Sequence, residues 1–550
     1  MPNRPRLKTF FTPPVLMLGA IALAWCWYFH FWPLLHTANE AIRLDFVQAI
    51  VDDGTFQIDQ VEKRHGKPSI DRCRFGHHDY MDKAPGLSLL TVPIYAAVKA
   101  IAPNVQRFDE IWKVGQLACL FTTALPLLLA LRQMFLFFRR RGVSEPDAAL
   151  TLCALGLASP VFVYSTLFFG HGLATACVML GFFQWVERDS AKSQFVAGLW
   201  LGLAGLTDTP VFVLGALICI YSALERSRHA QPPQVTAVRT LALGLPIAAG
   251  LAIFVGLQLG YNFATVGDPL RFTYHYKADP RFAAIMATGV LGFGLPTPRA
   301  LFELLFGASR GLFYASPILL AGLCGHIISL INNDLAPDRR RESGFCLTAI
   351  TAYTLFVAGF GDWHAGDSPG ARHLLPITPL MAAGLPTLLA CRLPQLLRGL
   401  VAAAIAIGVL MALATIASFP YHFEALQRPV LEFSWPLAMS GHFSPSIGRT
   451  VGLNDWLSFG LFCTFILAAF SLSLLAMKRD PNQIPPVGSR ASNLAVASLI
   501  TAAWVIALMA TVPEPGRVVE ILRFQGSTML GPNADERADN KPWQRAVRDR

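Results

Sequence analysis

The feature that most constrains this chain is a series of apolar runs, each about 20 residues long, that recur along most of its length. A helix of this length spans a bilayer core of about 30 Å. Only 15% of the 550 residues are charged, whereas soluble domains carry roughly 25%. We therefore predict an all-α polytopic membrane protein rather than one large soluble enzyme.

Clusters of Lys and Arg beside the apolar runs indicate the orientation. Cytoplasmic loops carry an excess of basic residues, so Arg4, Arg6 and Lys8 place the N-terminus in the cytoplasm. The net charge of +10 has the same explanation, and no basic groove with interleaved aromatic residues indicates nucleic acid. The runs predict about thirteen spans within residues 1–512 and a short exterior tail at 513–550.

The predicted spans alternate in direction when every basic cluster is kept on the cytoplasmic side. The segment 85–102 is also apolar, but a crossing there would place Arg139, Arg140 and Arg141 outside. We therefore expect an interfacial or re-entrant helix at 85–102. The predicted spans are 14–35, 117–138, 148–168, 171–185, 195–206, 210–224, 239–261, 311–331, 344–360, 374–391, 399–418, 457–477 and 493–512.

With this topology, four polar segments lie on the exterior side, which we expect to be the periplasmic face of a bacterial inner membrane. They are residues 36–86, 263–310, 361–373 and 419–455. The first segment is strongly charged along most of its length, and we expect the chemistry there. Within it, 39–53 has apolar residues at helical spacing, which predicts an amphipathic helix on the membrane surface.

Several polar side chains of the first segment have both an ordinary and a functional interpretation. Lys83 stands where the charged segment meets an apolar helix, so it either extends to the interface or binds a lipid phosphate as a point charge. Tyr80 and Asp82 are placed to orient its ammonium group. Glu40 and Arg43 are three residues apart and can form an ion pair, although such a pair has little specificity.

Five further candidates come from later in the chain. His171 begins a predicted span, and a neutral interfacial histidine is its simplest interpretation, although ionisable groups facing a cavity in a membrane protein tend to be functional. Arg310 and Arg372 either anchor to the interface or grip a phosphate through two parallel hydrogen bonds. Trp363 and His364 offer flat rings and polar groups that suit a sugar.

The order of features in residues 39–86 resembles that of one known superfamily. A first span precedes an exterior segment that opens on an acidic helix ending near Gly54 and closes with Met81-Asp82-Lys83-Ala84-Pro85. This order is similar to that of the GT-C superfamily of polyprenyl-phosphate-sugar glycosyltransferases. The nearest branch is that of protein O-mannosyltransferases and lipid A aminoarabinose transferases. The match is clearest in the first third of the chain and elsewhere is mainly one of topology.

The resemblance implies a GT-C-like bundle in which Lys83 corresponds to the family's lysine for the lipid phosphate. The family opens its exterior segment with Asp-Glu, whereas this chain has Asn39-Glu40, and an amide cannot accept a proton as a base. Two candidate bases are therefore left, Glu40 and Asp45, with Asn39 kept as a substrate-binding residue. The family's second acid falls near His171.

The implied reaction transfers a sugar from a polyprenyl monophosphate donor to an acceptor hydroxyl, with inversion and a carboxylate as general base. Lys83, with Arg43, Arg310 or Arg372, would neutralise the leaving phosphate. The sugar is mannose or a pentose such as arabinose or aminoarabinose, and the acceptor is a lipid, a glycan or a protein. The other expected partners are membrane lipids.

No cofactor is expected, and a divalent metal is compatible with the reaction although no spacing of Cys and His indicates one. The chain also has no P-loop, no HExxH sequence and no serine nucleophile elbow. Two alternatives stay open. One is a transporter or flippase of a lipid-linked sugar, which would need internal repeats and polar groups near mid-membrane. The other is an oligosaccharide ligase or polymerase.

Overall fold

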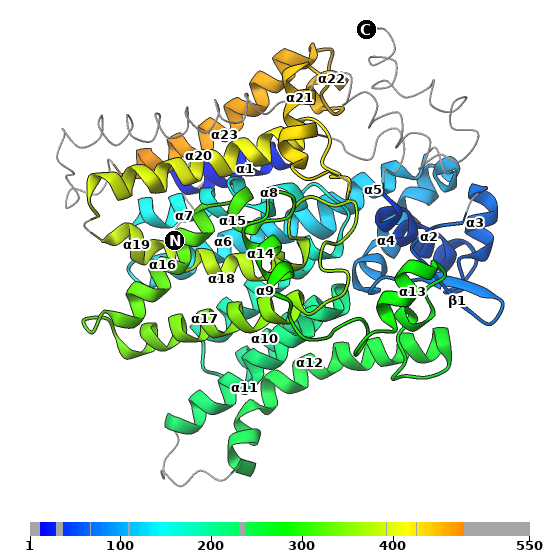
Figure 1. Ribbon diagram of the computed structural model, residues 1–550, viewed down its shortest axis with the longest axis horizontal. Helices are drawn as coiled ribbons and strands as arrows, with labels where there is room; N and C mark the ends of the chain where they lie inside the picture. The colour runs from blue at the N-terminus through cyan, green and yellow to red at the C-terminus, as the bar shows by residue number, and fades with distance from the viewer. Residues whose placement is uncertain are drawn as a thin grey trace, which may run out of the picture.

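The computed structural model is mostly helical, as predicted (Figure 1). Within the described part of the chain, one two-stranded antiparallel sheet is the exception to the all-α prediction. Strand β1 (Arg72–Phe75) pairs with β2 (His78–Met81), and Cys73 lies opposite Tyr80. The structure describes residues 12–28, 37–66, 68–107, 110–229, 237–391, 393–424 and 426–477. The predicted span at 493–512 and the tail at 513–550 lie outside these residues.

The helices fall into two groups. One group belongs to the polar segments: α2 (Ala38–Asp52), α3 (Asp59–His65), η5 (Thr273–Tyr276), α13 (Pro280–Met286), α14 (Pro298–Leu305), η7 (Val430–Ser434), α21 (Trp435–Met439) and α22 (Ile447–Thr450). The short helix η2 (Pro103–Gln106) follows the helix at 86–101 and lies outside the polar segments. The others form the apolar bundle: α1 (Pro13–Trp25), α4 (Gly86–Ile101), α5 (Trp112–Cys119), η3 (Leu120–Ala124), α6 (Leu125–Arg140), α7 (Glu145–Leu157), α8 (Pro160–Tyr164), α9 (Gly170–Glu187), α10 (Ala191–Thr207), η4 (Thr209–Val211), α11 (Phe212–His229), α12 (Ala237–Val266), α15 (Leu312–Ala315), α16 (Ile318–Ile331), α17 (Pro337–Ala358), η6 (Arg372–Ile377), α18 (Thr378–Ala382), α19 (Leu385–Ala390), α20 (Gln395–Ala417) and α23 (Asp455–Met477).

Six helical segments of the described chain are long and apolar enough to cross a membrane, by length and composition. Each of them coincides with a predicted span. The total of about thirteen spans is not confirmed, because several other predicted spans are shorter or interrupted helices. The six segments are Trp112–Arg140, Thr209–Ser227, Ala242–Val266, Arg372–Ala390, Gln395–Ala417 and Asp455–Ser473.

Several predicted spans have different limits in the structure, among them 14–35, 148–168 and 311–331. The first, 14–35, corresponds to α1, which ends at Trp25. The span 148–168 is divided into α7 and α8 at Pro160, and 311–331 is divided into α15 and α16 near Pro317. Proline lacks the N–H that would continue the preceding helix, and it is tolerated at the start of a new one. The predicted helix at 85–102 is confirmed as α4.

Helix α9 lies inside the bundle and carries the candidate residue His171 in its first turn. Every residue from Gly170 to Met179 is buried, which is the pattern of a helix enclosed by others. Helices α6 and α10 and the turn η6 pack against it. The first turn of α9, with His171, lies close to Arg43 of α2, so this buried helix begins beside the first polar segment.

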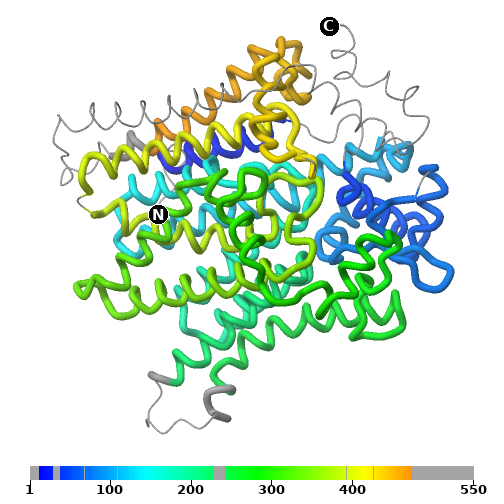
Figure 2. The backbone as a smooth tube through the Cα atoms, in the orientation of Figure 1, coloured from blue at the N-terminus to red at the C-terminus, as the bar shows by residue number. Residues whose placement is uncertain are grey.

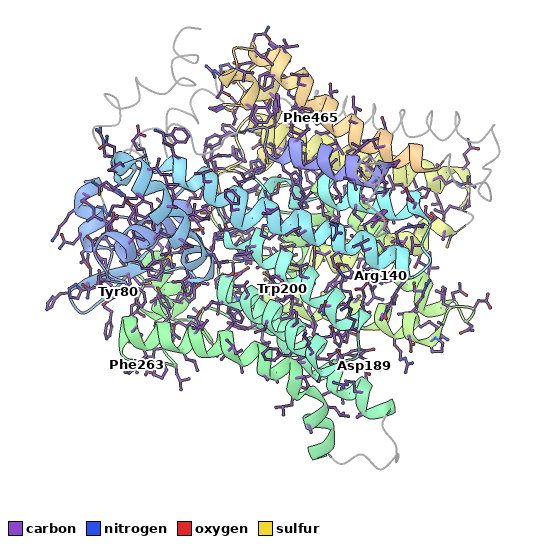
Figure 3. The ribbon with its side chains drawn as sticks, turned by 180° about the vertical axis from the view of Figure 1, so that it is seen from behind. Tyr80, Arg140, Asp189, Trp200, Phe263 and Phe465 are labelled. Atoms are coloured by element: carbon purple, nitrogen blue, oxygen red, sulfur yellow. The ribbon has the colours of Figure 1, made fainter. Side chains whose placement is uncertain are left out.

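The basic clusters gather at one end of the bundle. Arg141 pairs with Glu342 there, and Arg140 lies 2.7 Å from Glu187. Figure 3 shows Arg140 at this end and Tyr80 at the opposite one. In the structure, as in the predicted topology, the arginine-rich loops are therefore separated from the polar segment 36–86 by the length of the bundle.

The four predicted exterior segments contact one another and form what we call the polar layer, residues 37–85, 267–310, 361–373 and 418–454. The backbone N–H of Ala278 donates to the carbonyl of Arg72 at 3.0 Å. Arg310 donates to carbonyl groups of the third segment, and the N–H of Glu424 donates to Asp367 at 2.9 Å. Figure 2 shows the first segment, in blue, at the end of the bundle opposite the arginine-rich loops.

The predicted surface helix 39–53 is instead enclosed by protein. It corresponds to α2, in which every residue from Ile42 to Ala49 is buried. Helix α4 covers one side of α2, where the hydroxyl of Tyr95 donates to Asp52 at 2.8 Å. Helix α3 and strand β2 contact α2 as well. The charged side chains of α2 therefore have protein partners, and α2 forms part of the core of the polar layer.

Candidate active site

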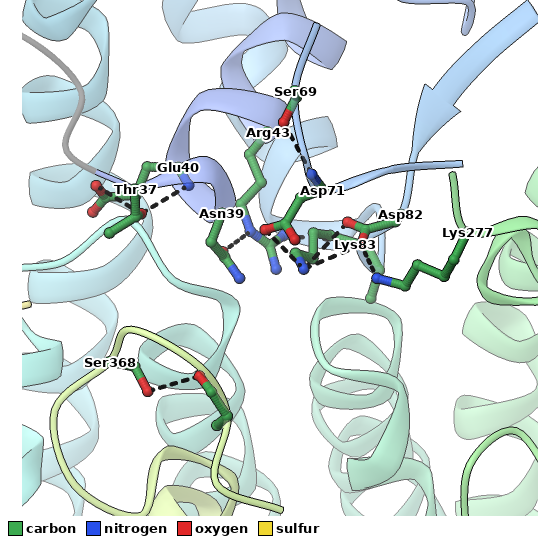
Figure 4. A network of polar contacts seen from close by, with 12 residues as sticks. Thr37, Asn39, Glu40, Arg43, Ser69, Asp71, Asp82, Lys83, Lys277 and Ser368 are labelled. Atoms are coloured by element: carbon green, nitrogen blue, oxygen red, sulfur yellow. Dashed lines mark hydrogen bonds and ion pairs between the residues drawn. The ribbon is translucent and has the colours of Figure 1, made fainter. Parts of the chain in front are cut away.

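Asn39 and Arg43 lie about one turn apart on α2, so their side chains project from the same face. The guanidinium of Arg43 donates through Nε to Asn39 Oδ1 at 3.0 Å and through Nη1 to the carbonyl of Ala84 at 3.2 Å. These bonds direct Arg43 toward the junction between β2 and α4, where Lys83 lies (Figure 4). The described contacts include no ion pair between Arg43 and Glu40, contrary to the sequence-based expectation.

Lys83 lies between two carboxylates, of which Asp82 is fully buried and Asp71 is partly buried. Its Nζ is 3.1 Å from Asp71 Oδ2 and 3.2 Å from Asp82 Oδ1. A second lysine, Lys277, contacts Asp82 from the other side (Figure 4). Burial alone would raise the pKa of Asp71, but the charges of Lys83 and Lys277 outweigh it and hold that pKa below its ordinary value. Asp82 is therefore in contact with the ammonium of Lys83, and its orienting role stays a prediction.

Lys277 is a site residue that sequence reasoning missed. It is the one lysine of the segment 263–310 and stands beside Tyr274 and Tyr276, a basic and aromatic combination that could have drawn attention to it. Its position depends on a backbone bridge to Cys73 of β1. No local pattern predicts a pairing between segments so far apart in sequence.

Arg372 approaches the same place from η6. Its guanidinium lies 5.6 Å from the ring centre of Phe169, and its buried Nε has no hydrogen-bond partner among the described residues. The positive charge of Arg372 contributes to lowering the pKa of Asp71 and that of Arg43. Arg43, Lys83, Lys277 and Arg372 therefore all lie within electrostatic range of Asp71 or Asp82, and we call them the cationic cluster.

The first turn of α9 meets the end of α10 beside this cluster. Nδ1 of His171 is 2.7 Å from Oδ2 of Asp208, and the His171 ring makes an edge contact with His373 at 5.3 Å between centroids. A Cβ atom at Gly170 would lie 3.2 Å from Nη2 of Arg43. The Arg43 guanidinium is thus close to the backbone that carries His171.

Glu40, the first predicted base, has its partners elsewhere. Its carboxyl group is fully buried and accepts hydrogen bonds from the Tyr421 hydroxyl at 2.9 and 3.0 Å and from the Phe168 N–H at 3.2 Å. Figure 4 shows it on the side of α2 away from Lys83. Burial raises the pKa of Glu40 to about 8, although the hydrogen bonds from Tyr421 and Phe168 favour the charged form. At neutral pH this side chain therefore carries a proton.

We expect Glu40→Gln to preserve folding, and Glu40→Leu to destabilise the protein by about 1–3 kcal/mol, because leucine leaves the Phe168 N–H and Tyr421 hydroxyl without an acceptor. The folded-state pKa of Glu40 lies above its ordinary value of 4.5. Its contribution to stability is then present below pH 4.5 and lost as pH rises through 8. Thermal unfolding between about pH 5 and 9 should show a steeper decline for wild type than for Glu40→Gln. Parallel curves for the two proteins would contradict this assignment.

Asp45 and Tyr80 also lie apart from the cluster. Asp45 follows Arg43 by two positions, about 200° around a helix, and lies 3.0 Å from Nδ1 of His65. Tyr80 is paired within the sheet, and no polar contact among the described residues joins its hydroxyl to Lys83.

The remaining predicted residues lie in the loop 361–373 or contact it. Arg310 is 3% exposed and donates to two carbonyl groups of the segment 361–373, which it supports. His364 Nδ1 is 3.4 Å from Glu424, and Trp363 packs partly buried against the core. Among the described residues, no three His, Cys, Asp or Glu side chains form a group able to hold a metal ion.

No protein-family model and no curated protein sequence matches the chain. ArnT from Cupriavidus metallidurans bound to undecaprenyl phosphate has a similar structure, with 16% identity, a TM-score of 0.47 and coverage of 84% of this chain and 77% of that one. The arabinosyltransferase EmbB from Mycobacterium smegmatis has 12% identity, a TM-score of 0.40 and coverage of 93% and 42%. The oligosaccharyltransferase AglB from Archaeoglobus fulgidus has 11% identity, a TM-score of 0.35 and coverage of 90% and 56%. These three proteins are similar to the chain in structure, at identities of 16% or less.

Proposed function

We propose that this chain is an integral-membrane glycosyltransferase that moves a sugar from a polyprenyl monophosphate donor to an acceptor hydroxyl. The observation that carries the proposal is the cationic cluster, in which a buried guanidinium nitrogen of Arg372 has no hydrogen-bond partner among the described residues. Buried polar groups are normally satisfied, and a guanidinium fits a phosphate through parallel hydrogen bonds. An anionic phosphate therefore suits this place.

The charge change in the reaction explains why several cations would be needed. A polyprenyl phosphate sugar is a phosphodiester with one negative charge, and the departing polyprenyl phosphate is a monoester that gains a second. Fixed cations stabilise this developing charge more strongly in the transition state than in the ground state. Lys83 would act as the point charge nearest the phosphate, while Asp71 and Asp82 hold its ammonium group in place.

The position of Lys83 also suits a lipid-linked substrate. Three residues after it, α4 begins and continues as an apolar helix. Leu89 and Leu90 of α4 are exposed by 36% and 41%, which gives a prenyl chain an apolar surface beside the phosphate. His364 Nδ1 lies 3.5 Å from Asp362, whose carboxyl group is within electrostatic range of Lys83 and Lys277. Trp363 and His364 would contact the sugar.

We also propose the membrane topology of the chain. Residues 1–512 would form one GT-C-like membrane domain of a bacterial inner membrane, with the N-terminus in the cytoplasm. The exterior segments and the tail at 513–550 would face the periplasm. The separation of the arginine-rich end from the polar layer supports this arrangement, because basic loops remain cytoplasmic.

The test uses the purified full chain in nanodiscs with synthetic polyprenyl phosphates carrying arabinose, aminoarabinose or mannose. The measured quantity is free polyprenyl phosphate, with and without lipid, glycan and peptide acceptors. Wild type should release it, and Lys83→Met should release it about 100-fold more slowly because one fixed positive charge is lost.

Lys99→Met is the matched control. Lys99 is also a lysine in this region, and it pairs with Asp52 at 2.6 Å on the far side of α2 from the cationic cluster. We expect this variant to retain wild-type turnover. If wild type binds donors but releases no polyprenyl phosphate with any acceptor, the result favours a transporter and contradicts the proposal.

A further inference from the structure

Transfer to a hydroxyl needs a group that accepts its proton near the departing phosphate. The two carboxylates predicted for this role are engaged elsewhere, Glu40 with Tyr421 and Asp45 with His65. Asn39, which contacts Arg43 in the cluster, is an amide and does not act as a base. Asp71 and Asp82 are paired with Lys83 and Lys277, so we expect a base on another element that reaches the cationic cluster.

The His171–Asp208 pair has the geometry of an oriented base. With Nδ1 of His171 2.7 Å from the Asp208 carboxylate, the proton of a neutral imidazole lies on Nδ1, and the lone pair lies on Nε2. No described residue forms a hydrogen bond with Nε2. The side chains of His171 and Asp208 are 9% and 11% exposed, so the pair is held by protein but is not sealed from the polar layer.

The groups that face His171 come from several elements. Arg43 approaches from α2, Arg372 and His373 from η6, and the ring of Tyr164 from α8 at 6.1 Å between centroids. Burial, and to a smaller extent the two guanidinium groups, disfavour an imidazolium before reaction, whereas the Asp208 carboxylate stabilises the imidazolium that forms when Nε2 takes a proton. Burial and nearby charges, that of Lys83 among them, hold the pKa of the neighbouring His373 well below its ordinary value.

We propose that His171 is the general base that activates the acceptor hydroxyl and that Asp208 is the positioning residue that orients it; this rests on the proposed glycosyl transfer. Nε2 takes the hydroxyl proton while the oxygen forms a bond to the anomeric carbon. The bond between that carbon and the phosphate oxygen breaks, and its electron pair leaves with polyprenyl phosphate. The imidazolium then returns its proton to water.

The experiment measures kcat, donor KM and the pH–rate profile of the full chain in nanodiscs. His171→Gln should lower kcat by about 10²–10⁴-fold, the range for loss of a general base, while donor KM changes by less than about 3-fold. Asp208→Asn should also lower kcat and should move the acidic limb of the profile to lower pH, because an amide no longer stabilises the imidazolium. Asp208→Glu should restore part of the rate and the original limb.

His65→Gln is the control, because His65 forms a comparable pair with Asp45 outside the cluster; it should leave all three quantities unchanged. Wild-type kcat and pH profile in His171→Gln, or an unshifted acidic limb in Asp208→Asn, would overturn the inference while leaving the transferase proposal intact. Absence of transfer by wild type would instead remove the proposed function and the base together. If His171→Gln fails to fold, the pH of the acidic limb in Asp208→Asn and Asp208→Glu decides whether His171 is the base.

Discussion

Asp82→Asn is expected to lower the free energy of unfolding by about 3–5 kcal/mol and to reduce sugar transfer by more than about 100-fold. Asp82 is fully buried and contacts both Lys83 and Lys277. An amide would leave two neighbouring ammonium groups without this shared counter-charge, and removing one partner of a buried ion pair is strongly destabilising. The ammonium of Lys83 would also lose one of the two carboxylates that fix its position.

The measurement is chemical or thermal unfolding in detergent, together with the release of polyprenyl phosphate. Asp53→Asn serves as the control. Asp53 pairs with Arg64 at 2.8 Å near the surface, so its loss should cost less than about 1 kcal/mol. If Asp82→Asn were as stable and as active as Asp53→Asn, the central role of the Asp82 carboxylate would be wrong.

Gly86→Leu is expected to have the second large effect, because Gly86 is the place where α4 touches the end of α10. A Cβ atom there would lie 2.7 Å from Thr207 Oγ1 and 2.9 Å from the backbone carbonyl of Leu206. The backbone cannot yield as a flexible side chain would, so α4 must move away. Such overpacking costs about 1–3 kcal/mol. The shift would also displace Lys83, three residues earlier, and a misplacement of about 1 Å can lower turnover 100-fold.

Gly19→Leu is a matched control for this substitution. Gly19 is also helical, in α1, and a Cβ atom there meets nothing within 4 Å. We expect Gly19→Leu to unfold at the wild-type temperature and to turn over normally, while Gly86→Leu loses both stability and activity. Equal unfolding temperatures for the two variants would show that the α4–α10 contact does not position Lys83.

The sequence predicts the bundle well because its main signals are local. Apolar length and the position of basic residues indicate the helices and separate their two ends. The interruptions near Pro160 and Pro317 were also visible in principle, since proline ends a helix for a reason contained in the residue itself. The burial of α2 could not be seen in the sequence. An amphipathic helix has the same residue pattern on a membrane surface as in a polar core whose groups are hydrogen-bonded.

The candidate site is only partly predictable. Lys83 and Asp82 stand beside each other in sequence at the edge of an apolar helix, so local reasoning found them. Lys277 and Asp208 reach the site through contacts with distant segments, at Cys73 and His171 respectively. Asp208 lies at the junction between α10 and η4, and nothing in that junction predicts which histidine it meets.

A structure of the full chain in a nanodisc with bound polyprenyl phosphate would show where the phosphate binds. We expect the phosphate within hydrogen-bond distance of Lys83 and the Arg372 guanidinium, with the prenyl chain along α4 beside Leu89 and Leu90. A phosphate bound at the opposite end of the bundle, among Arg139 to Arg141, would contradict this expectation.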